Sequence, residues 1–224
     1  MTELHPDVGR QIERLILDQR RPVIVTDADE VLFAFMADFE TWLGTKGYRF
    51  AWGSFSLSGN IREATTDRAL DQSEMPALLG GYFADRTEFV PAVEGAATAL
   101  ARLSARAQVV VLSNLPLENR EARARALARA GMHYPLVANS GAKGAAVAAI
   151  AARSGRPVVF LDDGPNHIVS VGKAVPDSLR LHFVADPRLA KLIGPAKDSH
   201  RRVDRWDEAT RIIEAALEAG APTP

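Results

Sequence analysis

Short apolar runs alternate with amphipathic stretches along most of the chain. Residues 23–25, 109–112 and 158–161 are continuous apolar runs rich in β-branched side chains, and residues 136–138 and 179–184 repeat this pattern more weakly. These runs are too short for helices and lack the alternation of a half-exposed strand, so they predict strands buried on both faces of a parallel sheet.

Helical periodicity occupies the segments between these runs. An opening helix is indicated by Val8, Ile12, Leu15 and Ile16, and further helices are expected at residues 94–106, 118–130, 143–154, 165–173 and 208–219. Strands that alternate with helices predict an α/β protein with a Rossmann-like open parallel sheet and right-handed crossovers.

One connection breaks this alternation. About 80 residues separate the first strand from the second, whereas a crossover needs only roughly 10 to 12. We therefore expect a core formed by residues 1–34 and 90–224 and a small helical module at residues 35–89. The module is rich in aromatic residues, which could line a substrate pocket but are more readily explained as its own core.

Two helix-start signals lie inside this module. Asn60 is followed three residues later by Glu63, and Ser73 precedes Pro76. Both patterns are typical of helix N-termini, so each predicts the beginning of a helix.

Composition and charge exclude several classes of protein. The 224 residues include 27 Lys and Arg against 28 Asp and Glu, so no basic excess favours binding to nucleic acid. No cysteine is present, which excludes disulfides, thiolate nucleophiles and Cys-type zinc sites. No apolar run approaches the roughly 20 residues that cross a bilayer, and the N-terminal sequence does not resemble a secretion signal. A cytoplasmic protein without a membrane partner is the expectation.

Polar residues follow three of the predicted strands. They are Asp27 and Asp29 after the first strand, Ser113 and Asn114 after the second, and Asp162 and Asp163 after the fourth. Because loops at the carboxyl ends of parallel strands converge, these side chains are expected to meet. Clustered carboxylates are unfavourable unless a cation neutralises them, and ligands that are all oxygen favour Mg²⁺ over zinc.

At these positions the sequence resembles the haloacid dehalogenase-like superfamily of phosphohydrolases. The first motif, Asp-x-Asp-x-Thr/Val, is matched by Asp27, Asp29 and Val31, the second by Ser113, the third by Lys143 and the fourth by Asp162 and Asp163. Each motif alone is weak, but the four occur in order along most of the chain. Lys173 is an alternative candidate for the third motif.

The resemblance implies a strand order of 5-4-1-2-3, counted over the five predicted strands, and a cap formed by the inserted module. It further implies that Asp27 attacks phosphorus and that Asp29 serves as acid and then as base. Mg²⁺ would be bound by the Asp27 side chain, the Asp29 backbone carbonyl and Asp162, with Asp163 close by. Lys143, Ser113 and the backbone amides near Asn114 would bind the phosphoryl oxygens.

The resemblance favours a Mg²⁺-dependent phosphatase that acts on a small phosphorylated metabolite. A phosphomutase of the same superfamily and a non-catalytic module that binds a phosphorylated ligand remain alternatives. Dehalogenation is disfavoured because Asp29 is present. The substrate and the oligomeric state are not fixed by the sequence.

Each candidate residue also has a plainer explanation. Asp and Ser after a strand often form turns or cap helices, and a Lys at a helix start is usually solvated. Asn166 and His167 fall on the turn just after the acidic pair, so either could reach the rim of the pocket, but the start of a surface helix is the favoured interpretation. The basic cluster Arg201, Arg202 and Arg205 is interleaved with acidic residues, so a solvated face is expected there.

Overall fold

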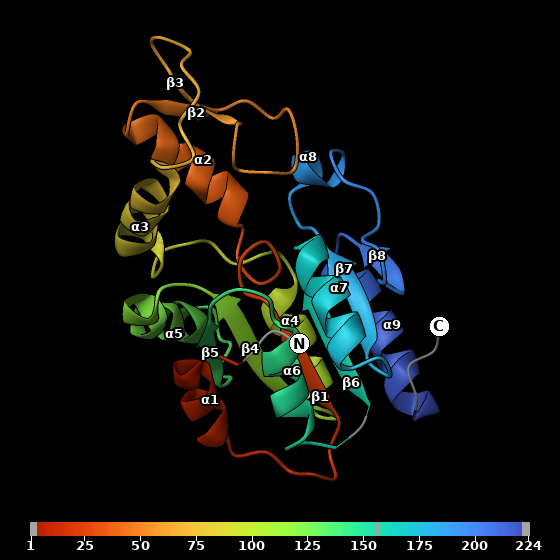
Figure 1. Ribbon diagram of the computed structural model, residues 1–224. Coiled ribbons are helices and arrows are strands. Elements are labelled where there is room, and N and C mark those ends of the chain that lie inside the picture. The colour runs from red at the N-terminus through yellow and green to blue at the C-terminus, as the bar shows by residue number, and fades with distance from the viewer. Residues whose placement is uncertain (1–3, 156, 221–224) are drawn as a thin grey trace.

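A six-stranded parallel sheet forms the centre of the computed structural model, which describes residues 4–155 and 157–220 (Figure 1). Its strands lie in the order β5-β4-β1-β6-β7-β8. They are β1 (Val23–Thr26), β4 (Gln108–Asn114), β5 (Leu136–Asn139), β6 (Val158–Asp162), β7 (Leu179–Phe183) and β8 (Arg201–Val203). Read from β7 to β5, this is the predicted order 5-4-1-2-3, so the fold class is confirmed.

Helices cover both faces of the sheet. One face carries α1 (Pro6–Glu13), α6 (Gly144–Ala151) and α7 (Pro165–Ala174), and the other carries α4 (Ala96–Ser104), α5 (Arg120–Arg129) and α9 (Trp206–Ala219). In β1, Val23 and Val25 pack into one core while Ile24 packs into the other. Alternate residues thus face two apolar layers, which is why the strand sequences are continuously apolar.

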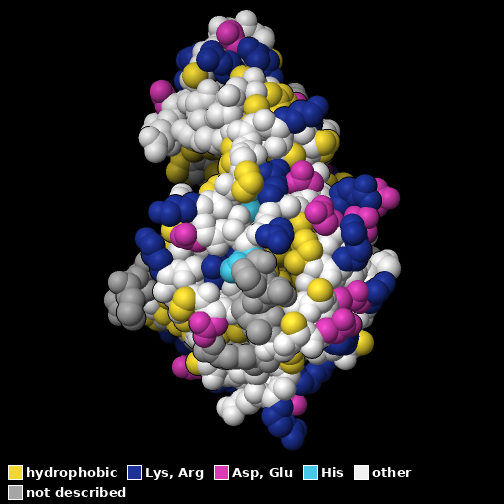
Figure 2. Space-filling model, turned by 90° about the vertical axis from the view of Figure 1, so that its right-hand side faces the viewer, with side chains coloured by type: hydrophobic (Ala, Val, Ile, Leu, Met, Phe, Trp, Pro, Cys, Tyr) yellow, Lys and Arg dark blue, Asp and Glu magenta, His cyan; other side chains and the backbone are white. Residues whose placement is uncertain are grey.

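The long connection after β1 forms a lobe above the carboxyl ends of the strands (Figure 1). It contains α2 (Phe35–Thr45), β2 (Tyr48–Phe50), β3 (Ile61–Glu63) and α3 (Met75–Arg86). Figure 2 shows this lobe from the side, rising above the rest of the molecule. The insertion is confirmed, but it is not purely helical, because β2 and β3 pair as an antiparallel ribbon.

The helix start predicted at Asn60 is wrong. Asn60 precedes β3, and its side-chain amide donates to the carbonyl of Ser56 at 2.7 Å and to the hydroxyl of Ser54 at 2.7 Å. The side chain therefore closes a loop instead of capping a helix. The second signal is confirmed, since α3 begins at Met75 with Pro76 in its first turn.

Aromatic side chains form the core of the inserted lobe. Phe35, Phe39, Trp42 and Tyr82 lie in mutual stacked and edge-to-face contact, and the ring centroids of Phe39 and Tyr82 are 5.0 Å apart. The buried Tyr82 hydroxyl donates to Asp38 at 3.0 Å. These rings are therefore used for packing within the lobe.

One aromatic residue of the lobe contacts the core instead. The guanidinium of Arg188, on the short helix α8 (Pro187–Ala190), lies 3.9 Å from the centroid of the Trp52 ring. Arg188 also pairs with Glu40 of α2, and the Trp52 indole N–H donates to Glu40 at 2.8 Å. These contacts join the lobe to the core.

The C-terminal region departs from the prediction at the basic cluster, where Arg201–Val203 forms β8 beside β7. Val203 is buried, and the Arg202 guanidinium donates to the backbone carbonyl of Ile193 at 2.8 Å. The segment 201–203 was expected to be a solvated face because of its charges, but it pairs with β7 as an edge strand. Basic and acidic side chains are mixed over the core on the face seen in Figure 2. Among the described residues, no helix has the length and apolarity of a membrane span.

Candidate active site

The first and fourth motifs meet at the carboxyl ends of two neighbouring strands. β1 and β6 are paired, and the backbone N–H of Asp27 donates to the carbonyl of Leu161 at 2.9 Å. This pairing places Asp27 beside Asp162, which ends β6 and is fully buried. Two acidic side chains that lie far apart in the sequence are therefore neighbours.

Lys143 bridges these two carboxylates. Its ammonium lies 2.7 Å from Oδ1 of Asp27 and 2.7 Å from Oδ2 of Asp162, and its side chain is fully buried. Burial alone would lower the pKa of Lys143, but the two carboxylates outweigh this effect and raise its pKa above the ordinary value. Lys173, the alternative candidate, is exposed on α7. The lysine that meets the carboxylates is Lys143.

Three carboxylates lie close enough to share one metal ion. Asp27, Asp162 and Asp163 each offer an oxygen, and these atoms lie within 4.8 Å of one another. Burial, and then the charge of Asp162, raises the pKa of Asp163 well above its ordinary value. A divalent cation would relieve this repulsion, and a donor set made only of carboxylates fits Mg²⁺.

The backbone around the acidic pair is held by further contacts. The N–H of Gly164 donates to Oδ1 of Asp162 at 2.9 Å, and a Cβ at this glycine would lie 3.1 Å from that oxygen. The fully buried His182 accepts from the N–H of Ala196 at Nδ1 and contacts the carbonyl of Asp163 at 2.8 Å through Nε2. Nε2 therefore carries the proton and donates a hydrogen bond to this carbonyl, which holds the backbone at Asp163. Nothing in the sequence pattern pointed to this histidine.

Asp29 is not one of the three carboxylates that could share a metal ion through their side chains, and it pairs with an arginine instead. Its Oδ1 accepts a hydrogen bond from Nη2 of Arg123 at 2.6 Å, and the Arg123 side chain is fully buried. Burial raises the pKa of Asp29, although Arg123 opposes the shift. Sequence reasoning missed Arg123, but one signal was present: it shares the buried face of α5 with Ala126 and Leu127, where a charge is unexpected.

Glu30 links the site to the inserted lobe. Its carboxylate accepts the backbone N–H of Met36 at 2.9 Å and that of Asp186 at 2.7 Å, and burial raises its pKa to about 7. Its backbone has a φ of 62° and donates to the carbonyl of Phe33 at 2.8 Å. The segment after β1 is therefore a tight turn and not the first turn of a capped helix.

The second motif contributes Ser113, which is fully buried near the end of β4. No hydrogen-bond partner for its hydroxyl lies among residues 4–155 and 157–220. The neighbouring Asn114 is already engaged: its amide donates to the carbonyl of Gly141 at 2.9 Å and accepts from Asn139 at 2.6 Å.

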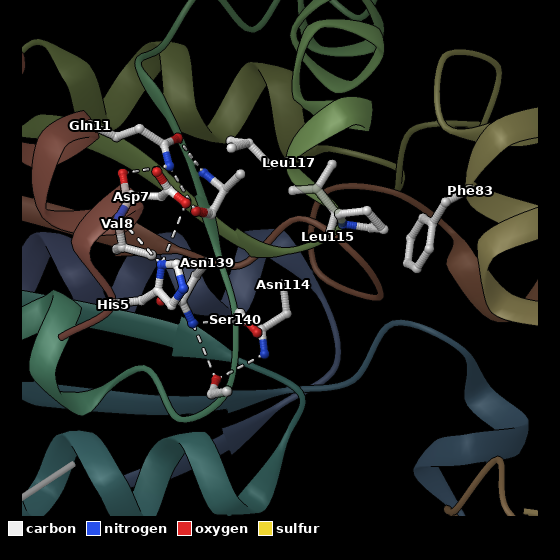
Figure 3. A pocket seen from close by; sticks show the side chains of 13 residues that line it. His5, Asp7, Val8, Gln11, Phe83, Asn114, Leu115, Leu117, Asn139 and Ser140 are labelled. Carbon is white, nitrogen blue, oxygen red and sulfur yellow. Dashed lines mark hydrogen bonds and ion pairs between the residues drawn. The ribbon is translucent and has the colours of Figure 1, made fainter. Parts of the chain in front are cut away.

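A cavity of about 430 Å³ opens beside this loop, between the start of α1 and the inserted lobe (Figure 3). Asn114, Asn139 and Ser140 lie along it, and Phe83 reaches it from the lobe. Its lining does not include Asp27, Lys143 or Asp162. The carboxylate cluster is therefore not part of this cavity.

His167 is not the surface residue that its position suggested. It lies in the first turn of α7, its Nδ1 is buried, and no partner for this atom occurs in the described parts of the chain. Burial and the neighbouring Lys143 lower its pKa to about 4. The ring is therefore neutral beside the site.

No family model and no curated protein sequence matches the chain. Solved structures match over most of its length. A HAD family hydrolase from Deinococcus radiodurans R1, determined with bound phosphate and sodium, has a TM-score of 0.59 at 15% identity and covers 92% of this chain and 100% of its own.

Two further structures extend this similarity. YfnB from Bacillus subtilis, determined bound to magnesium, has a TM-score of 0.54 at 13% identity and covers 88% of this chain and 100% of its own. A Thermotoga maritima protein assigned as a β-phosphoglucomutase has a TM-score of 0.56 at 13% identity and covers 87% and 99%. At such identities the similarity establishes the fold, and the chain has the fold of the haloacid dehalogenase-like hydrolases.

Proposed function

We propose that this protein is a Mg²⁺-dependent phosphohydrolase that cleaves a small phosphorylated metabolite through an aspartyl-phosphate intermediate. The observation that carries the proposal is the buried cluster in which Lys143 contacts Asp27 and Asp162 while Asp163 lies within metal-sharing distance. Such a cluster is costly for folding alone. Its charges suit a site that receives a divalent cation and a phosphate.

We further propose that residues 35–89 act as a cap over a catalytic core of residues 1–34 and 90–224. The aromatic cluster within the lobe supports this division, because it gives the lobe a core of its own. The position of the lobe above the carboxyl ends of the strands also supports it (Figure 1). A cap in this place would exclude water during phosphoryl transfer.

In the first step, a carboxylate oxygen of Asp27 forms a bond to phosphorus as the bond from phosphorus to the leaving oxygen breaks. Asp29 gives its proton to that oxygen, so the leaving group departs as an alcohol. Burial raises the pKa of Asp29, and this direction supports the role because it favours the protonated form that the first step requires.

In the second step, water attacks the phosphorus of the aspartyl phosphate and gives a proton to the Asp29 carboxylate. The bond between Asp27 and phosphorus breaks, which releases inorganic phosphate and restores both side chains. Asp29 therefore serves first as acid and then as base.

The remaining residues bind the metal ion and the phosphoryl oxygens and offset their charge. Mg²⁺ held by Asp27, Asp162 and Asp163, with the backbone carbonyl of Asp29, would offset the negative charge of the phosphoryl oxygens. The Lys143 ammonium acts in the same direction, and the unpaired Ser113 hydroxyl can donate to one of these oxygens. Backbone amides near Asn114 complete the phosphoryl site.

A phosphomutase is the second candidate, and the similarity to the Thermotoga maritima protein favours keeping it. In that reaction a sugar hydroxyl takes the place of water in the second step. Incubation with a hexose phosphate separates the two, because a phosphatase releases inorganic phosphate whereas a mutase forms an isomeric sugar phosphate.

The proposal is tested by hydrolysis of p-nitrophenyl phosphate and of a panel of phosphorylated metabolites with Mg²⁺ or with EDTA. Asp27→Asn is expected to lower turnover by at least ~10³-fold, because an amide is a poor nucleophile. Asp207→Asn, an exposed residue paired with Arg205, is the matched control and should retain full activity. Full activity of Asp27→Asn would refute the nucleophile. Failure of the wild type to bind a fluoride mimic of phosphate would favour a non-catalytic module.

A further inference from the structure

Arg123 is a buried cation that the proposed chemistry does not yet use. Its side chain is fully buried, and its guanidinium lies 4.9 Å from the centroid of the Phe33 ring. Nε and Nη1 are buried and have no hydrogen-bond partner within residues 4–155 and 157–220. A buried guanidinium with unsatisfied donors is unfavourable for stability, so its one strong contact, to Asp29, points to a role in the site.

The two partners are buried to different degrees. The Asp29 side chain is 17% exposed, whereas that of Arg123 is 0% exposed. Arg123 therefore lies behind the carboxylate on the protein side, and Asp29 is the member that a substrate can reach. Any effect of Arg123 on the reaction must pass through Asp29.

The contact engages one of the two carboxylate oxygens. Oδ1 of Asp29 accepts from Nη2 of Arg123 at 2.6 Å, while no residue of the described chain donates a hydrogen bond to Oδ2. Phe33, under the guanidinium, is fixed in turn by its N–H bond to the carbonyl of Ala28 at 2.9 Å. One oxygen is thus anchored to rigid surroundings, and the other remains available for proton transfer.

We propose that Arg123 is a positioning residue that holds Asp29 so that Oδ2 delivers its proton to the leaving oxygen. This inference rests on the proposed function, since it assigns a task within that reaction. The physical reason is orientation: a carboxylate free to rotate would spend much of its time out of reach, and a displacement of about 1 Å can cost roughly 10²-fold in rate.

The test compares substrates that differ in their need for an acid. An alkyl phosphate releases a basic alkoxide that must be protonated, whereas 2,4-dinitrophenyl phosphate releases a stable phenolate that needs no proton. For both substrates kcat/KM is measured with Mg²⁺, because it reports only the steps up to transfer of the phosphoryl group.

Arg123→Met is expected to lower kcat/KM for the alkyl phosphate by ~10²-fold and for the dinitrophenyl ester by less than about threefold. Asp29→Asn should show the same selectivity. Arg125→Met provides the control on the same helix, because Arg125 is exposed and pairs with Glu88; neither substrate should be affected. A purely structural role for Arg123 would lower both rates equally, and that result would overturn the inference.

Arg123→Lys keeps the test decisive if Arg123→Met does not fold. A lysine retains the charge but lacks the planar fork of the guanidinium, so we expect a loss for the alkyl phosphate of about tenfold and little loss for the dinitrophenyl ester. Equal losses for the two esters would again reject the inference. If the wild type hydrolyses neither ester, the proposed function itself fails.

Discussion

Two buried cations stand at the same edge of the sheet, and they differ in what they neutralise. Lys143 lies 2.7 Å from each of two carboxylates, and both of these are almost fully buried. Arg123 contacts one carboxylate, Asp29, which is partly exposed. Both cations are fully buried themselves, so the difference lies in their partners.

Because of this difference, we expect the stability of the fold to depend on Lys143 more than on Arg123. Lys143 holds two groups that would otherwise be buried like charges, so the folded state depends on it strongly. The Asp29 side chain is partly exposed to solvent, so the fold can tolerate the loss of Arg123 more easily. The comparison teaches that Lys143 supports the structure of the site, whereas Arg123 supports the orientation of one residue.

Lys143→Met should have the largest effect on stability. Without Mg²⁺, removal of the ammonium leaves Asp27 and Asp162 buried without their cation, and we expect the free energy of unfolding to fall by about 3–5 kcal/mol. Urea denaturation in EDTA at pH 8 measures this loss. Mg²⁺ should restore more stability to this variant than it adds to the wild type, since it replaces the missing charge.

Lys173→Met is the control for that experiment. Lys173 is exposed on α7, so its loss should change the free energy of unfolding by less than about 0.5 kcal/mol. Equal effects of the two lysine variants would show that the bridge to Asp27 and Asp162 contributes nothing to the fold.

Arg123→Met should lower the free energy of unfolding by a smaller amount, about 1–2 kcal/mol. The loss of Arg123 leaves Asp29 unpaired, but that carboxylate is partly exposed to water, and two unsatisfied buried donors disappear with the guanidinium. The same urea titration measures it. A loss as large as that of Lys143→Met would remove the distinction between the two cations.

The smallest expected effect is the dependence of stability on the protonation of His167. Burial and Lys143 lower the pKa of this residue to about 4. Because this pKa lies below that of an unfolded histidine, about 6.5, the neutral ring contributes stability above pH 6.5 that is lost as the pH falls toward 4. NMR titration should show this pKa rising by ~0.5 or more in Lys143→Met and remaining unchanged in Arg123→Met. An unchanged value in both variants would mean that Lys143 does not influence the ring.

The fold was largely predictable because buried parallel strands leave a clear pattern. The runs at residues 23–25, 109–112 and 158–161 became β1, β4 and β6, since both faces of each strand meet apolar layers. The three-residue strands β2, β3 and β8 were not predicted. In such short edge or ribbon strands, pairing with a neighbour decides the conformation, and the sequence carries little periodicity.

The site residues at the strand ends could be proposed from their positions in the sequence, and Lys143 at the start of α6 from the family resemblance, whereas Arg123 on α5 was missed. Asp27, Ser113 and Asp162 lie at the carboxyl ends of buried strands, and this position, together with the motif resemblance, brought them into consideration. Arg123 lies on a helix with several other arginines, where residue type does not distinguish the buried one. Its partner Asp29 is 94 positions away in the sequence, so no local motif connects them.

The sequence by itself determined that several carboxylates gather at one edge, because a parallel sheet places all its carboxyl ends together. Only the tertiary structure decided which cation meets which carboxylate. That choice depends on how α5 and α6 pack on the sheet, and it is fixed by contacts between residues far apart in the chain. For this reason Lys143 and not Lys173 bridges Asp27 and Asp162. For the same reason Arg123, and not another arginine of α5, is buried against Asp29.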